Sequence, residues 1–221
     1  MRITDEIYQV GGMGLTSGDD AAIYLIHFDG HAALVDAGCG HSQDKLLENI
    51  RECGVDPGKI EYLLITHCHF DHTGGVSSLK QRLGCTIIAH ELDARFLEQG
   101  DNEVTAANWY GSSLTPFIVD RKLTDPEEEI PLGRRVITAV HMPGHSPGSV
   151  VYQTASEGLR VLFAQDVHGP LDPTLRSNRE DYFHSLERLI ALDADILCEG
   201  HYGVYKGKQR VKEFISSFLP Q

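Results

Sequence analysis

Residues 65–75 read ITHCHFDHTGG and place three histidines and one aspartate within six consecutive positions, from His67 to His72. Side chains this polar do not build a hydrophobic core. The apolar run 60–66 just before them predicts a buried strand, and Gly74-Gly75 just after them predicts the start of a helix. The cluster is therefore expected in a loop at the carboxyl end of a strand, where α/β proteins usually carry their functional residues.

The spacing H-x-H-x-D-H indicates a metal site, because imidazole nitrogen and carboxylate oxygen are the ligands that zinc and similar divalent ions bind. Structural zinc sites favour cysteine, whereas His/Asp sites with further ligands downstream are typically catalytic. Three such residues follow later strands or turns: His145, Asp166 and His201. Seven candidate ligands are too many for one ion and about right for two.

The rest of the chain alternates short apolar runs with helical patterns, which predicts a mixed α/β fold. Asp29-Gly30 predicts a two-residue hairpin turn between two of the strands, and the acidic segment 125–133 is expected to be a solvated turn into a strand. The order fits two sheets packed face to face with helices outside. Strands are expected at 21–28, 31–38, 85–90, 134–141, 148–154, 159–166 and 194–200, and helices at 42–54, 74–84, 91–100, about 179–192 and 207–218.

These motifs resemble the metallo-β-lactamase-fold hydrolase superfamily, including its glyoxalase II-like and lactonase-like members. The resemblance spans residues from about 20 to 205 and rests on THCHFDHTGG (66–75), PGHSPG (143–148), Asp166, Gly200-His201 and the early LVDAG (34–38). It implies a four-layer αββα sandwich formed by one hydrolase domain over residues 1–221. It also implies the metal ligands: His67, His69 and His145 for a first ion, Asp71, His72 and His201 for a second, and Asp166 as the bridge between them.

The expected cofactors are two divalent metal ions, Zn²⁺ in the first place with Fe or Mn as alternatives. Two such ions can share a hydroxide, because coordination lowers the pKa of water from 15.7 toward about 7, and this hydroxide attacks an electrophilic carbonyl or phosphorus. Asp71 would orient that nucleophile or pass on its proton. His168, close to Asp166 in the sequence, is a second catalytic candidate that would hydrogen-bond the substrate.

Three further side chains have two readings each. Asp36 either fixes the tautomer of a ligand histidine or caps a turn. Trp109 and Tyr110 either wall the substrate pocket or pack against residues 91–99, and packing is slightly favoured. Cys68, which alternates with the clustered histidines, is expected to point away from the metals and to pack in the core.

The expected activity is hydrolysis of a small-molecule thioester, lactone or ester. An acid at the bridging position, Asp166, disfavours a β-lactamase, and His69 disfavours flavodiiron-like oxidoreductases. The alternatives are an iron-dependent redox protein of the sulfur dioxygenase type and a phosphodiesterase on the same fold.

The formal charge is −13, from 19 Lys and Arg against 32 Asp and Glu, and it disfavours nucleic acid as a partner because phosphate backbones are repelled. The N-terminal segment does not resemble a secretory signal, and no run of 18 apolar residues is present, so a cytoplasmic protein without membrane contact is expected. The five cysteines lack paired spacing and are expected to be reduced. A homo-oligomer remains open.

Overall fold

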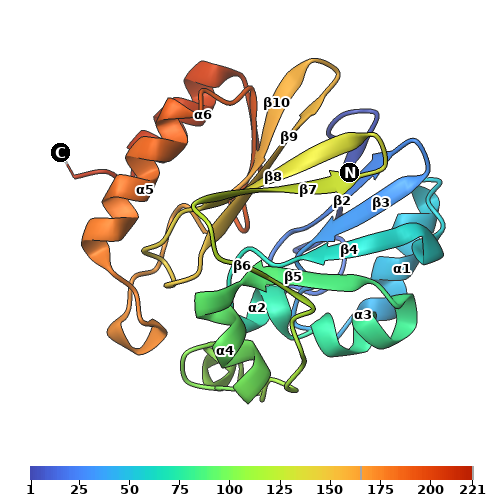
Figure 1. The fold of residues 1–221 in the computed structure, drawn as a ribbon, viewed down its shortest axis with the longest axis horizontal. Helices are drawn as coiled ribbons and strands as arrows, with labels where there is room; N and C mark the ends of the chain where they lie inside the picture. The colour runs from blue at the N-terminus through green and yellow to red at the C-terminus, as the bar shows by residue number, and fades with distance from the viewer. Residues whose placement is uncertain (165, 221) are drawn as a thin grey trace.

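The secondary structure forms four layers (Figure 1). Three separate apolar clusters lie between these layers. In this computed structural model, residues 1–164 and 166–220 are described. One cluster lies between the two sheets, and each of the others lies between a sheet and the helices outside it. This arrangement confirms the predicted four-layer αββα sandwich.

The first half of the chain forms one six-stranded sheet, in which the first three strands pair antiparallel and the later ones parallel. Its strands, in spatial order, are β1 (Ile7–Gly11), β2 (Ile23–Phe28), β3 (His31–Val35), β4 (Ile60–Leu64), β5 (Thr86–His90) and β6 (Arg121–Leu123). Helices α1 (Gln43–Glu52), α2 (Phe70–Thr73), α3 (Val76–Leu83) and α4 (Glu91–Gln99) lie along its outer side (Figure 1).

The second half forms the other six-stranded sheet, whose pairs are antiparallel except for β10 with β11. Its strands, in spatial order, are β12 (Val204–Lys206), β11 (Ile196–Cys198), β10 (Leu159–Phe163), β9 (Val150–Ser156), β8 (Arg135–His141) and β7 (Glu127–Leu132). Helices α5 (Arg179–Ala191) and α6 (Lys208–Ser216) cover its outer side (Figure 1). Short 3₁₀ turns occur at Pro57–Lys59, Ala107–Tyr110 and Pro173–Leu175.

Strand β2 shows why both faces of the first sheet are buried. Successive side chains of a strand point to opposite faces, so Ile23 and Leu25 pack under the helices while Tyr24 and Ile26 face the other sheet. Both sets are apolar, as expected of a sheet covered on both sides. The sheets therefore hold each other through a continuous apolar layer, and their loops meet at a shared edge.

The hairpin prediction is confirmed, because Asp29 and Gly30 adopt φ of 51° and 87° and join the antiparallel strands β2 and β3. The prediction for the acidic segment is wrong: it forms strand β7, where exposed Glu127 and Glu129 alternate with buried Ile130 and Leu132. An edge strand tolerates such charges because one of its faces remains in water. Strands β1, β6 and β12 and helix α2 were not predicted.

All five cysteines are free, as the sequence predicted. Among the described residues, no helix combines the length and apolar character needed to cross a membrane.

Replacing Phe163 with alanine is expected to lower the free energy of unfolding by about 3–5 kcal/mol, because this fully buried ring packs between the sheets at 5.6 Å from the ring of Tyr24. Urea unfolding followed by circular dichroism measures the change. The control Ile118→Ala, at a side chain 70% exposed, should stay within about 0.5 kcal/mol of the wild type. Equal losses in the two variants would contradict the packing described here.

Candidate metal centre

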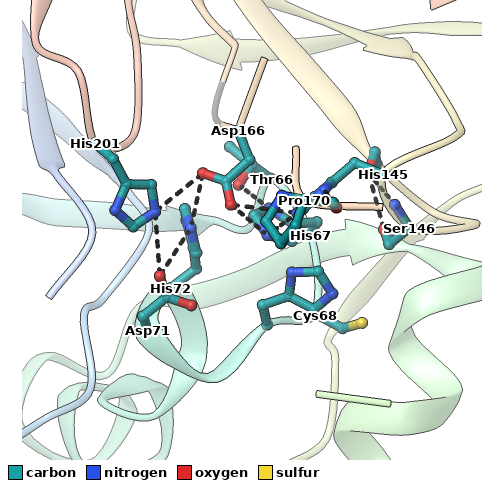
Figure 2. A network of polar contacts seen from close by, with 12 residues as sticks. Thr66, His67, Cys68, Asp71, His72, His145, Ser146, Asp166, Pro170 and His201 are labelled. Atoms are coloured by element: carbon teal, nitrogen blue, oxygen red, sulfur yellow. Dashed lines mark hydrogen bonds and ion pairs between the residues drawn. The ribbon is translucent and has the colours of Figure 1, made fainter. Parts of the chain in front are cut away.

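Segments that leave four strands converge at one edge of the sandwich (Figure 2). The 67–72 segment follows β4, and the loop with His145 joins β8 to β9. Asp166 follows β10, and His201 follows β11. Two of these segments leave parallel neighbours, β10 and β11, whose carboxyl ends must lie together. The fold thus brings together all seven residues that the sequence singled out.

Their side chains form two neighbouring groups with Asp166 between them (Figure 2). Within each group, the potential ligand atoms lie within 4.8 Å of one another. The first group is His67, His69, His145 and Asp166, and the second is Asp71, His72 and His201.

The Asp166 carboxylate faces both groups, one oxygen to each. Its Oδ2 lies 3.6 Å from Nε2 of His67 and 3.2 Å from Nε2 of His145. Its Oδ1 lies 3.3 Å from Nε2 of His72 and 3.2 Å from Nε2 of His201. Asp166 adopts a left-handed φ of 53°, a conformation that non-glycine residues rarely adopt outside functional sites and tight turns.

Hydrogen bonds on the far side of three imidazoles fix the nitrogen that faces the cluster. Nδ1 of His145 donates to the Pro170 carbonyl at 2.9 Å, and Nδ1 of His72 donates to the Asp36 carboxylate at 2.7 Å. The Thr66 hydroxyl donates to Asp36, so its oxygen is free to accept from Nδ1 of His67 at 3.1 Å. With the proton on Nδ1, the neutral form of such a ring presents the lone pair of Nε2 to the centre.

Several of these atoms are buried and have no hydrogen-bond partner within residues 1–164 and 166–220: His69 Nε2, His72 Nε2 and Asp166 Oδ1. Buried polar atoms are nearly always paired, and each unpaired one costs about 1–3 kcal/mol. Burial also lowers the pKa of His67 well below its usual value and that of His69 to about 3, so both rings are neutral, the form that binds metal. The donor set therefore fits divalent ions.

The spacing of the atoms supports the same conclusion. Ligands about 2.0–2.1 Å from a tetrahedral ion lie about 3.3 Å from one another. Nε2 of His67 and Nε2 of His145 are 3.2 Å apart, and Nε2 of His201 lies 3.2 Å from Oδ2 of Asp71. Nitrogens this close gain nothing from each other unless a shared proton or a cation lies between them.

Asp36 anchors the 67–72 segment. It is fully buried, with a left-handed φ of 62°, and its Oδ1 accepts from the backbone N–H of Thr66 while Oδ2 accepts from the Thr66 hydroxyl and from His72. The two readings of Asp36 are therefore both realised, since one carboxylate holds the turn and orients a ring.

A second buried carboxylate, Asp93 on α4, joins two of the loops. Its Oδ2 accepts from the N–H of Cys68 at 2.9 Å and from the Ser146 hydroxyl at 2.6 Å, and its Oδ1 accepts from the N–H of Gly148 at 2.7 Å. The segments that carry His67 and His145 thus share one anchor. Sequence reasoning missed it, because an acid in the first turn of a helix is ordinarily a solvated residue.

A third, Glu199, has the same role at the end of β11. It is fully buried, and its Oε2 accepts from the backbone N–H groups of His201 and Tyr202. Its Oε1 lies 2.8 Å from Nδ1 of His168. This residue was also missed, although its position two residues before His201 could have indicated it.

The two predicted catalytic residues both lie at the centre. Oδ2 of Asp71 is 3.2 Å from Nε2 of His201, and the phenol of Tyr110 lies beside the same carboxylate. Burial and the charge of Asp71 raise the pKa of that phenol. The His168 ring centroid lies 5.1 Å from that of His201, and its Nε2 has no hydrogen-bond partner among the described residues.

The ring of Tyr110 lies 5.7 Å from that of Phe70 on α2, beside Asp71, which favours a position in the wall of the site for this residue. Its neighbour Trp109 is 57% exposed. Cys68 is buried in the apolar cluster under the helices, and its sulfur points away from the centre, as predicted (Figure 2).

Comparison with known proteins gives concordant results. Residues 17–201 match the metallo-beta-lactamase superfamily. The chain is 30% identical to the acyl-coenzyme A thioesterase MBLAC2 of Gallus gallus, over 92% of this chain and 79% of that protein. It is 28% identical to the hydroxyacylglutathione hydrolase GloC of Haemophilus influenzae, over 79% and 81%. Among solved structures, the metallo-beta-lactamase GOB-18 of Elizabethkingia meningoseptica superposes with a TM-score of 0.77 at 27% identity, over 99% and 86%.

Replacing Asp93 with asparagine is expected to weaken metal binding about 10–100-fold, since an amide NH₂ would face N–H or O–H donors in place of an acceptor. Competition with a chromophoric chelator measures the affinity. Glu91→Gln is the matched control, because it makes the same change at an exposed position of the same helix. Affinity unchanged in Asp93→Asn would show that the anchor does not position the ligands.

Proposed function

Because the chain belongs to the metallo-beta-lactamase superfamily and is a metallohydrolase, we propose that it cleaves small-molecule thioesters with two bound divalent ions. The observation that carries the proposal is the Asp166 carboxylate, whose two oxygens face two separate groups of ligand atoms. A carboxylate in that position can bridge a pair of cations, which matches the dinuclear sites used for hydrolysis.

The proposed ligands divide around Asp166. His67, His69 and His145 would hold one ion, Asp71, His72 and His201 would hold the other, and Asp166 would be shared between them. Zinc is the expected metal, since imidazole-rich sites with carboxylate suit it, and iron or manganese are the alternatives.

When bound, such ions polarise a carbonyl oxygen and lower the pKa of water to near neutrality. The residues of the chain supply orientation. We assign to Asp71 the placing of the attacking water and the transfer of its proton. This role is supported by the position of the Asp71 carboxylate, which lies 3.2 Å from Nε2 of His201 and beside the phenol of Tyr110.

His168 is proposed to hydrogen-bond the substrate. Glu199 holds its Nδ1, which limits rotation of the ring, and a ring nitrogen lies within 4.8 Å of ligand atoms of Asp166 and His201. A thiolate leaving group suits this arrangement, because thiols have a pKa of about 8.5 and leave without a strong acid catalyst.

The relatives favour a thioester over a lactone or an ordinary ester. Two of them are named for hydrolysing acyl-coenzyme A and hydroxyacylglutathione, and in both compounds the acyl group is carried on a thiol sulfur. The proposal takes residues 1–221 as one hydrolase domain. It places the protein in the cytoplasm, without nucleic acid or membrane as a partner, in line with the charge of −13.

Purified protein is expected to bind two zinc ions and to cleave acyl thioesters without consuming oxygen. A chelator should abolish cleavage, and added zinc should restore it. The test is metal analysis of the purified protein together with activity assays on a panel of thioesters, lactones, phosphodiesters and a carbapenem. One bound iron with oxygen uptake would favour the dioxygenase alternative, and cleavage of phosphodiesters alone would favour a phosphodiesterase.

The variant His168→Gln is expected to lower kcat about 10–100-fold, because a hydrogen bond to the reacting substrate is lost while the ligands stay in place. Steady-state kinetics together with metal analysis measures both effects. His184→Gln, at an exposed position of α5, is the control and should behave as the wild type. Loss of bound metal in His168→Gln, or an unchanged kcat, would contradict the assigned role.

A further inference from the structure

We propose that a hollow beside His201 binds the anionic, phosphate-bearing part of the thiol that carries the acyl group. The inference rests on the proposed function and names its substrate class. The hollow has a volume of about 660 Å³, within the usual range of small-molecule sites. The side chains that matter for its chemistry are Arg2, Met13, His201, Tyr202, Lys206 and Arg210.

The hollow adjoins the candidate metal centre through His201. His201 lines it and also faces Asp71 and Asp166 through Nε2. Tyr202, the next residue, lies on the same wall and contacts the ring of His168 at 4.8 Å between centroids. A substrate with its thioester carbonyl at the metals can therefore extend its carrier directly into this space.

Its charge is opposite to that of the protein as a whole. The chain carries 32 acidic and 19 basic residues, yet the lining contains Arg2, Lys206 and Arg210 against one carboxylate, Asp20. Asp20 is buried and already accepts from Thr16 and from the backbone N–H of Cys39. A basic site on an acidic surface selects anions that the rest of the molecule repels.

The three basic side chains differ in the partners that they already have. Arg2 pairs with Asp5 at an exposed position, and Lys206 donates one hydrogen bond to the carbonyl of Ile3. Arg210, in the first turn of α6, forms no ion pair with any other residue of 1–164 or 166–220. Its planar guanidinium has donors in the geometry that phosphate oxygens accept, which favours phosphate over an uncharged group.

The same hollow exposes apolar surface that a ligand would cover. Met13 is 80% exposed and Tyr202 is 61% exposed, although both are large side chains that are usually at least half-buried. The ligand is therefore expected to combine phosphate with a flat or apolar portion. A simple ester or lactone lacks the phosphate, whereas a nucleotide-containing thiol offers both features.

The test compares one acyl group on three thiols: coenzyme A with phosphates, glutathione with carboxylates, and neutral N-acetylcysteamine. The preference is measured as the ratio of kcat/KM for the coenzyme A thioester to kcat/KM for the N-acetylcysteamine thioester. The wild type should prefer the coenzyme A thioester, and Arg210→Glu should lower this ratio about tenfold. Lys212→Glu is the matched control, because it reverses an exposed charge on the same helix and should leave the ratio unchanged. The preference should also fall as salt is added.

Calorimetric binding of free coenzyme A, to the wild type and to both variants, separates this inference from the proposed function. Tight binding that Arg210→Glu weakens supports the phosphate site even if no thioester is cleaved, in which case only the proposed function fails. Equal ratios in the two variants, or equal weakening of the glutathione thioester, would overturn the phosphate site, as would undetectable binding of coenzyme A.

Discussion

Seven polar side chains turned toward one buried point are the constraint on which the rest of the structure depends. Imidazole and carboxylate atoms that face each other without partners destabilise a fold unless something holds them there. Three buried carboxylates do so, Asp36, Asp93 and Glu199, each accepting hydrogen bonds from segments that carry the cluster. The cluster is therefore preorganised, and its unpaired atoms are available to cations.

The two-sheet architecture follows from the same requirement. The first sheet supplies the 67–72 segment, and the second supplies His145, Asp166 and His201. Neither sheet alone completes a group of ligands, because Asp166 and His145 complete the first and His201 the second. The apolar layer between the sheets thus fixes the distance between the ligands. Packing and chemistry are coupled, even for residues far from the centre such as Phe163.

Much of this could be predicted from the sequence. Dense His and Asp residues after an apolar run located the centre, and alternating strands and helices predicted the layers. The missed residues lack such signals. Asp93 looks like an ordinary acid in the first turn of a helix, and Tyr110 reaches Asp71 from 39 positions away in the sequence. Strand β7 gives a weak strand signal because glutamates dominate its composition, although every second residue at its end is buried.

The central claim is that the two groups of ligands bind a pair of ions joined by Asp166. Anomalous diffraction from crystals of the zinc-loaded protein, recorded on both sides of the zinc absorption edge, tests it most directly. Two peaks are expected, one beside His67, His69 and His145 and one beside Asp71, His72 and His201, with the Asp166 carboxylate between them. A single peak, or peaks away from these residues in a fully loaded crystal, would contradict it.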